Sequence, residues 1–178
     1  MPMDFDKIEF KGHLRFLSNM WETPVLFDSK YQKEYPEIEF DDKTYMSSEH
    51  IYQMLKSKDP RWIKMIQDCA KPTKTKTLAR KYLTKQPTLF ETEQSIIRED
   101  WDDIKYRVMK IILFLKFSQN EELMVRLMLL EGPIEERNCW GDTYWGTVDG
   151  IGENNLGKLL MELRDYFIAG KEHLCWHI

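Results

Sequence analysis

The sequence lacks several features that define specialised classes of protein. Its three cysteines, Cys69, Cys139 and Cys175, are odd in number and far apart, which argues against a disulfide framework or a structural zinc site. No apolar run approaches the roughly 20 residues of a membrane-spanning helix. The acidic start, MPMDFDKIEF, has neither the basic nor the apolar part of a secretory signal. We therefore expect a cytoplasmic protein without a membrane segment.

An excess of positive charge is also missing. The chain has 26 basic and 30 acidic residues and a net charge of -4, so nucleic acid must be bound by a local patch. The segment 71–85 is rich in basic residues and has no acidic one, and it predicts contact with DNA or RNA. A solvated helix face is the more usual meaning of such a run. The residues expected to make this contact are Lys71, Lys74, Lys76, Arg80 and Lys81.

Aromatic residues are abundant, at 13% of the chain with six tryptophans. Trp and Tyr combine an apolar body with a polar group, so they are favoured in concave sites that bind bases or sugars. Packing in the core and at its margins is the simpler explanation.

The periodicity of the chain predicts a mainly helical α+β fold in one compact domain, residues 1–178, with a few N-terminal strands. We expect strands at 8–10, 25–27 and 38–45, the last with a hairpin turn at Asp41-Asp42, and a loop over 86–97. Helices are expected from Ser48 to about 57, from Pro60 to a stop at Pro72, and over about 78–83, 100–117, 120–130 and 155–170.

The helix after Ser48 is a candidate site. Glu49, Gln53 and Lys56 lie within about 60° of one another around its axis, and Tyr52 flanks them. The alternative is a solvated surface helix, in which Glu49 complements the helix dipole.

The segment 138–146 places Asp142 between two Trp-Gly pairs. Glycine allows close backbone approach to a ligand, and Trp and Tyr supply stacking surfaces. The alternative is a structural turn in which Asp142 accepts hydrogen bonds from backbone N–H groups.

Other motifs are weaker. Gly150–Gly157 lacks the βαβ context of a dinucleotide site, and is either an anion site at a helix N-terminus or a plain turn. His13 and His50 have no nucleophile context, so no catalytic triad is expected. His173, Cys175 and His177 match no common zinc spacing. We therefore expect no metal and no cofactor.

Several segments read together resemble the NADAR family, which includes the YbiA-like N-glycosidases. They are Leu17–Met20, Tyr45–Lys56, the helix from Trp101 to Phe117, Asp142–Gly146 and Asn155–Arg164. The match runs in order from about residue 14 to residue 168, with residues 31–36 as an apparent insertion.

The resemblance implies a hydrolase that cleaves the N-glycosidic bond between ribose and a base. It implies two substrate classes: ADP-ribose attached to guanine, which we expect here, and phosphorylated ribosylaminouracil intermediates of riboflavin synthesis. A non-catalytic module that binds ADP-ribose or a nucleotide is the third interpretation. The implied catalytic residues are Glu49, Asp142 and Trp101. The implied substrate-binding residues are Asn19, His50, Gln53, Lys56, Lys105, Tyr144, Trp145, Gly146, Asn155 and Gly157.

Cleavage of a ribosyl C–N bond passes through an oxocarbenium-like transition state, which two carboxylates can serve without a metal. We therefore expect Glu49 and Asp142 to line one pocket, with carboxyl groups roughly 5–10 Å apart. Trp101 or Trp145 should form a wall of that pocket. Lys56, Lys105 and free amides near Asn155, at a helix start that faces the pocket, are expected to contact phosphate.

Overall fold

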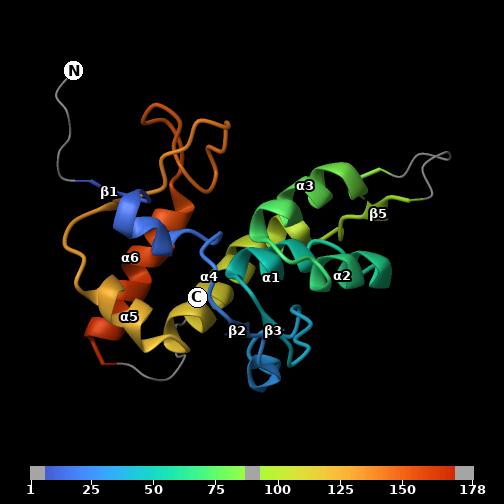
Figure 1. Cartoon of the computed structure of the whole chain (residues 1–178), viewed down its shortest axis with the longest axis horizontal. Helices are drawn as coiled ribbons and strands as arrows, with labels where there is room; N and C mark the ends of the chain where they lie inside the picture. The colour runs from blue at the N-terminus through green and yellow to red at the C-terminus, as the bar shows by residue number, and fades with distance from the viewer. Residues whose placement is uncertain (1–6, 87–92, 171–178) are drawn as a thin grey trace. The chain divides into compact units, whose positions relative to one another are not determined.

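The computed structural model describes residues 7–86 and 93–170, which fall into two compact units (Figure 1). The α1 unit is Asn19–Gln119, and the α6 unit is formed by the described residues before and after it. Helices dominate both units and each strand named below has two residues, so the expected mainly helical α+β class is confirmed.

The α1 unit contains four α-helices among its described residues: α1 (Ser48–Met54), α2 (Pro60–Gln67), α3 (Pro72–Tyr82) and α4 (Trp101–Ser118). Helix α1 contacts each of the other three (Figure 1), and every residue from Ser48 to Met54 is buried. The interpretation of α1 as a solvated surface helix is therefore wrong. A short polar helix is enclosed because α2, α3 and α4 cover it on different sides.

The strands β2 (Val25–Leu26) and β3 (Thr44–Tyr45) pair in an antiparallel ladder, and the 3-10 helix η2 (Ser29–Tyr31) lies between them in sequence. The expected strand 38–45 is thus limited to its last two residues, and the hairpin turn at Asp41-Asp42 is wrong. Asp42 has a φ of 56° and its carboxylate accepts hydrogen bonds from the amide and hydroxyl of Ser29, at 2.7 and 2.8 Å. These bonds therefore join the two ends of the segment that connects β2 to β3.

Proline has a different role at residue 72 from the one expected. Pro72 opens α3 at its first turn, where a missing N–H costs no hydrogen bond, so the short helix expected over 78–83 begins six residues earlier. Beyond α3, β4 (Leu83–Thr84) pairs in parallel with β5 (Ser95–Ile96). Part of the expected loop over 86–97 is therefore a strand.

Helix α4 confirms the strongest periodicity in the sequence. Its residues from Val108 to Phe117 are all buried, including Lys110 and Lys116. Burial lowers the pKa of Lys116 to about 7, because its ammonium is removed from water.

The α6 unit contains β1 (Ile8–Glu9), the 3-10 helix η1 (Gly12–Leu17), α5 (Glu121–Met128), β6 (Ile134–Glu135) and α6 (Asn155–Ile168). Strand β1 pairs in parallel with β6, and α6 packs on both α5 and β6. Leu156, Leu159, Leu160 and Leu163 of α6 are buried, as the expected helix requires. The aromatic loop, residues 138–154, connects β6 to α6.

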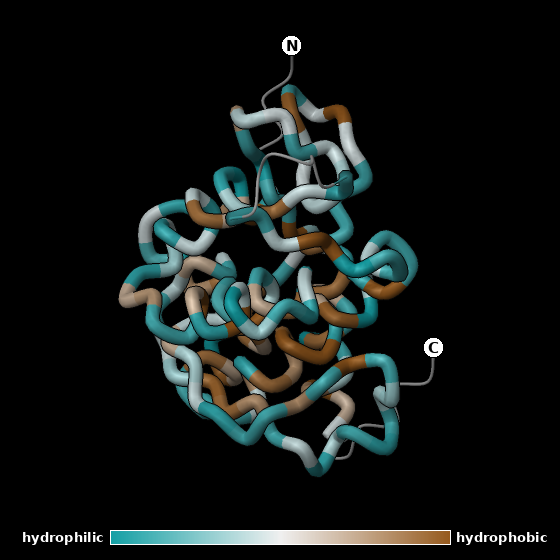
Figure 2. Tube along the Cα trace, turned by 90° about the vertical axis from the view of Figure 1, so that its right-hand side faces the viewer, coloured by the Kyte–Doolittle hydropathy of each residue, from teal (hydrophilic) through white to brown (hydrophobic). Residues whose placement is uncertain are grey.

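Hydropathy follows this packing. In Figure 2 hydrophobic and hydrophilic stretches alternate along the helical parts of the trace. The described helices are each too short or too polar to span a lipid bilayer.

Candidate functional site

The start of α1 is held by Asn19. The amide of Glu49 donates to the Asn19 carbonyl oxygen at 3.1 Å, and the Ser48 hydroxyl donates to Asn19 Oδ1 at 3.0 Å. The Asn19 amide nitrogen lies 3.1 Å from Met109 Sδ in α4. Asn19, expected to bind substrate, therefore satisfies orphan donors at the first turn of α1 and links this turn to α4.

Glu49 and Gln53 form a buried pair on one face of α1. Each is 3% exposed, and Gln53 Nε2 donates to Glu49 Oε1 at 2.7 Å. The four-residue spacing predicted that the two side chains share a face, and the structure shows them in direct contact. A carboxylate at this depth is held in one orientation by its partner, as a reacting group needs to be.

An aromatic pair with a cation continues the same face. The ring centroids of Tyr52 and Trp101 are 5.1 Å apart in an edge-to-face arrangement. Lys56 Nζ lies 5.1 Å from the Tyr52 centroid and 6.0 Å from that of Trp101. The sequence prediction included Lys56 and Trp101 among the catalytic and substrate-binding residues, and gave Tyr52 only as a residue that flanks the polar face of this helix. Its position three residues after Glu49 is the signal that places it there.

His50 is a core histidine. Its Nδ1 lies 2.8 Å from the Ser47 hydroxyl and its Nε2 lies 3.0 Å from the Cys69 carbonyl oxygen. Because a carbonyl only accepts, Nε2 carries a proton and the ring bridges α1 to the end of α2. Burial lowers the pKa of His50. Both ring nitrogens thus have protein partners.

Lys105 lies in α4 and pairs with a carboxylate. Its Nζ is 2.9 Å from Asp102 Oδ1, while Lys85 Nζ is 2.7 Å from Asp102 Oδ2. The hydrogen bonds from these two lysines lower the pKa of Asp102 to about 2. The expected phosphate contact of Lys105 therefore competes with an existing ion pair.

Asp142 organises the aromatic loop from within. Its Oδ1 accepts from the amides of Tyr144 and Trp145 at 3.1 and 2.9 Å. The backbone N–H and C=O of Asp142 are both bonded to the Asn138 amide. This is the geometry of the structural turn that the sequence left open as the alternative. The rings of Tyr144 and Trp145 meet edge to face at 4.8 Å.

The two site glycines allow close packing against β6 and the residue after it. A Cβ on Gly157 would lie 2.2 Å from the Ile134 carbonyl oxygen, and one on Gly146 would lie 2.1 Å from that of Glu136. Both positions therefore exclude a side chain for reasons of packing.

The expectation of free amides at the start of α6 is wrong. The amides of Asn155 and Leu156 donate to the carbonyl oxygens of Tyr144 and Trp145 at 3.2 and 3.0 Å, because the aromatic loop folds over this helix end. The Asn155 side chain donates to Glu153 at 2.8 Å.

The structure brings together Asn19, Glu49, Gln53, Lys56 and Trp101 within the α1 unit. Asp142, Tyr144, Trp145, Gly146, Asn155 and Gly157 belong to the α6 unit. Three expectations therefore stay predictions. They are the distance between the Glu49 and Asp142 carboxyl groups, the pocket that both should line, and the direction of α6 toward that pocket.

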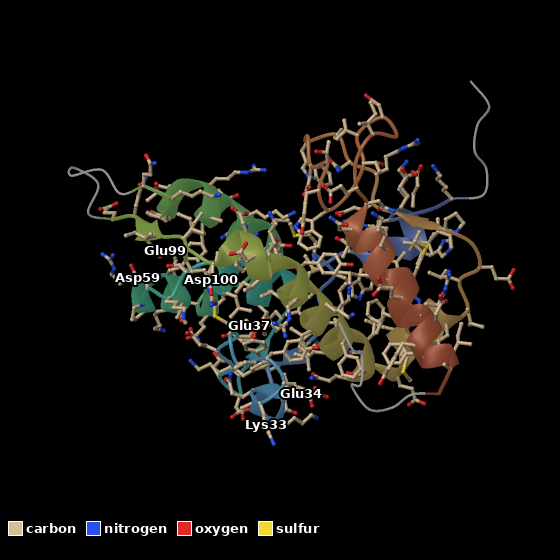
Figure 3. All side chains as sticks on the ribbon, turned by 180° about the vertical axis from the view of Figure 1, so that it is seen from behind. Lys33, Glu34, Glu37, Asp59, Glu99 and Asp100 are labelled. Atoms are coloured by element: carbon tan, nitrogen blue, oxygen red, sulfur yellow. The ribbon has the colours of Figure 1, made fainter. Side chains whose placement is uncertain are left out.

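An open cavity of about 590 Å³ lies elsewhere in the α1 unit, and none of the predicted site residues lines it. Asp59, Glu99 and Asp100, labelled in Figure 3, belong to its wall. Two of its carboxylates pair with arginines, Asp59 with Arg61 at 2.7 Å and Asp100 with Arg98 at 2.6 Å.

Metal ligands do not gather in the described part of the chain. No group of three or more His, Cys, Asp or Glu side chains there is arranged to hold a metal ion. His173, Cys175 and His177 lie outside the described residues.

Known proteins share both the sequence and the fold. The chain is 32% identical over 135 residues to the N-glycosidase YbiA of Shigella sonnei (strain Ss046), an alignment that covers 75% of this chain and 78% of that protein. It is 30% identical over 156 residues to a riboflavin biosynthesis protein of Vibrio vulnificus, covering 83% of this chain and 40% of that protein. The NMR structure of Escherichia coli YbiA has a TM-score of 0.72 and 27% identity, and the match covers 99% of this chain and 94% of that chain.

The model of the NADAR domain matches residues 9–168. This range includes α1, α4, the aromatic loop and α6, which carry the segments that suggested the resemblance. The chain therefore belongs to the NADAR domain family.

Proposed function

We propose that the chain hydrolyses the N-glycosidic bond between ribose and a nitrogenous base, with Glu49 as the carboxylate that serves the reacting carbon. That the chain is an N-glycosidase, and hence a hydrolase, follows from its similarity over 75% of its length to relatives of that name. The observation that carries the role of Glu49 is the buried Glu49–Gln53 pair.

The chemistry needs little beyond these groups. As the bond between ribose C1′ and nitrogen breaks, its electron pair leaves with the nitrogen and positive charge develops on the sugar. A fixed carboxylate stabilises this charge most effectively when it is oriented before the reaction. The oxygen of a water molecule then bonds to C1′, and Glu49 takes the proton that the water loses. The departing nitrogen takes a proton from solvent, and Glu49 later returns its proton to solvent, so that one water molecule is consumed overall.

The remaining groups of this face suit a phosphorylated nucleoside. The Tyr52–Trp101 pair offers an aromatic edge beside the carboxylate, and Lys56 offers a cation. The proposal needs one carboxylate, and Asp142, the second one that the resemblance implies, uses its Oδ1 to support the turn in the aromatic loop.

ADP-ribosylated guanine is our first proposed substrate, because it combines a ribosyl–nitrogen bond, a base and a pyrophosphate. The ribosylaminouracil phosphate is the second candidate, favoured by the name of the Vibrio vulnificus relative. Incubation of the wild-type protein with each compound, followed by mass spectrometry, tests both. We expect a free base and a free ribosyl product from one of them. Tight binding of ADP-ribose without cleavage of either compound would favour the non-catalytic module.

We also propose that α3 contacts nucleic acid when the modified guanine lies in DNA or RNA. Lys71, Lys74, Arg80 and Lys81 are exposed, and Pro72 and Thr75 of the same helix are buried. The basic side chains therefore cover the outer face of α3. Phosphate contacts of this kind raise affinity without reading sequence.

A matched pair of variants tests this contact. Lys74→Glu should weaken binding of an ADP-ribosylated oligonucleotide several-fold and leave cleavage of the free nucleotide unchanged. Lys33→Glu makes the same charge change at another exposed lysine. Equal effects of the two variants would show that only net charge matters, and would contradict a specific role of α3.

A further inference from the structure

Gln53 carries a buried acceptor without a partner. Its Nε2 donates to Glu49 and its backbone carbonyl oxygen accepts from the Trp62 indole at 2.9 Å. Its Oε1 is buried and has no hydrogen-bond partner in the described structure. A buried acceptor left in this state costs about 1–3 kcal/mol, so proteins rarely keep one without a reason.

The orientation of the amide explains why the acceptor is left over. Rotation of the amide by 180° would place Oε1, which cannot donate, against the carboxylate of Glu49. The 2.7 Å contact with Glu49 Oε1 therefore requires Nε2 on that side. The orientation that lets Gln53 donate to Glu49 thus leaves Gln53 Oε1 without a hydrogen bond.

Three other side-chain oxygens of the described residues are buried without a hydrogen-bond partner: Glu37 Oε1, Glu135 Oε2 and Glu136 Oε2. The first two are compensated by charge. Glu37 Oε1 lies 2.8 Å from Arg107, and Glu135 Oε2 lies 3.6 Å from Lys7. Neutral polar groups near Gln53 are also satisfied, since Ser48 donates to Asn19 and Ser47 lies within hydrogen-bond distance of His50. Glu136 belongs to the α6 unit. Among the described residues of the α1 unit, Gln53 Oε1 is thus the buried side-chain oxygen that neither a hydrogen bond nor an ion pair compensates.

We infer that Gln53 Oε1 accepts a hydrogen bond from the 2′-hydroxyl of the substrate ribose. The inference rests on the proposed function. The oxygen and nitrogen of one amide lie about 2.2 Å apart, which places Oε1 within about 5 Å of Glu49 Oε1. If Glu49 serves C1′, the hydroxyl on the neighbouring carbon is the donor nearest to this acceptor.

The same contact serves the reaction. Hydrogen bonds to the hydroxyl beside the anomeric carbon strengthen as the sugar becomes oxocarbenium-like, so they lower the barrier more than they raise ground-state affinity. Gln53 thereby joins two tasks, orientation of Glu49 and recognition of ribose against 2′-deoxyribose.

A cycle of two proteins and three substrates tests the inference. Wild type and Gln53→Met are assayed with the ribosyl substrate and with its 2′-deoxy and 3′-deoxy analogues. Intrinsic differences in sugar reactivity cancel, because each analogue meets both proteins. We expect Gln53→Met to lower kcat/KM about tenfold more on the ribosyl and 3′-deoxy substrates than on the 2′-deoxy substrate. Most of this difference should lie in kcat.

Equal effects of Gln53→Met on the ribosyl and 2′-deoxy substrates would overturn the inference and leave the proposed function intact. Coupling to the 3′-hydroxyl instead would overturn it as well. Failure of the wild type to cleave any ribosyl substrate would overturn the proposed function, and this inference with it. If Gln53→Met does not melt cooperatively, Gln53→Asn, which withdraws the same amide by one methylene, replaces it in the cycle.

Discussion

Polar side chains are used differently in α1 and in the aromatic loop. In α1 they are almost fully buried, and their partners include distant residues such as Asn19 and Cys69 besides neighbours in the same helix. In the loop, Asp142 is half-buried and bonds to its near neighbours Asn138, Tyr144 and Trp145. Gln53 holds the Glu49 carboxylate on a helix that Asn19 links to the rest of the α1 unit, whereas the bonds of Asp142 shape only the loop. This difference is the reason we propose that the reacting carboxylate lies in α1.

The largest effect on activity is expected for Glu49→Gln. Loss of the negative charge removes stabilisation of the oxocarbenium, so turnover should fall about 100-fold or more. Gln53 can still bond to the new side chain, so we expect the circular dichroism spectrum and the affinity for substrate to change little. Turnover near the wild-type rate on every cleaved substrate would show that Glu49 is a structural acid.

The second prediction concerns Lys116, a buried lysine outside the proposed site, and what its burial costs in stability. Its folded-state pKa is about 7 against an ordinary value of 10.5, so the unfolded chain binds the proton more readily. The free energy of unfolding should therefore rise as the pH rises from about 7 to 10.5. Lys116→Met should stabilise the protein by about 2–4 kcal/mol at pH 7 and reduce this rise. Urea unfolding across this pH range measures both.

The exposed Lys33 provides the control for this experiment. Lys33→Met removes one lysine without relieving burial, and its pH dependence should follow the wild type. A parallel pH profile for Lys116→Met would contradict the burial cost.

Gly157→Ala tests the close approach of α6 to β6. Its methyl group would lie 2.2 Å from the Ile134 carbonyl oxygen, so the variant should lose about 1–3 kcal/mol of stability. Gly170→Ala at the other end of α6 meets open space at a φ of 67° and should cost about 1 kcal/mol. Thermal melts compare the two. A larger loss at Gly170 would show that backbone strain, and not packing, governs this helix.

The smallest effect is expected for Asp142→Asn. The new side chain keeps an oxygen that can accept from Tyr144 and Trp145, so cleavage should change less than about threefold. Asp142→Ala removes this oxygen and should lower the melting temperature through a loss of about 1 kcal/mol. A 100-fold loss of turnover in Asp142→Asn would establish the second carboxylate and contradict the assignment to α1 alone.

The sequence predicted the long, periodic helices well. Apolar residues at steps of three and four marked α4 and α6, although α4 is buried on every side from Val108 to Phe117 and not on one face alone. The strands have two residues each, too few for a periodic signal, so β4, β5 and β6 were missed and the three expected strands were drawn too long. The sequence prediction also assigned Pro72 to the end of α2, because proline both stops and starts helices.

The site was predicted in part. The spacing of Glu49 and Gln53 gave their shared face, but burial of that face depends on α2, α3 and α4, whose packing no local pattern encodes. The contact between Tyr52 and Trp101 joins residues 49 positions apart, and it could not be predicted because it also depends on how the helices pack. The bonded amides of Asn155 and Leu156 depend on the path of the aromatic loop.

The most direct test of the central claim is a product analysis of wild type and Glu49→Gln under single-turnover conditions. Each protein, in excess over an ADP-ribosylated guanine or a ribosylaminouracil phosphate, is quenched at intervals and the products are identified by mass spectrometry. We predict that the wild type converts at least one substrate to its free base and the free ribosyl product, and that Glu49→Gln leaves that substrate intact over the same interval. Release of the base by both proteins at equal rates would contradict the claim.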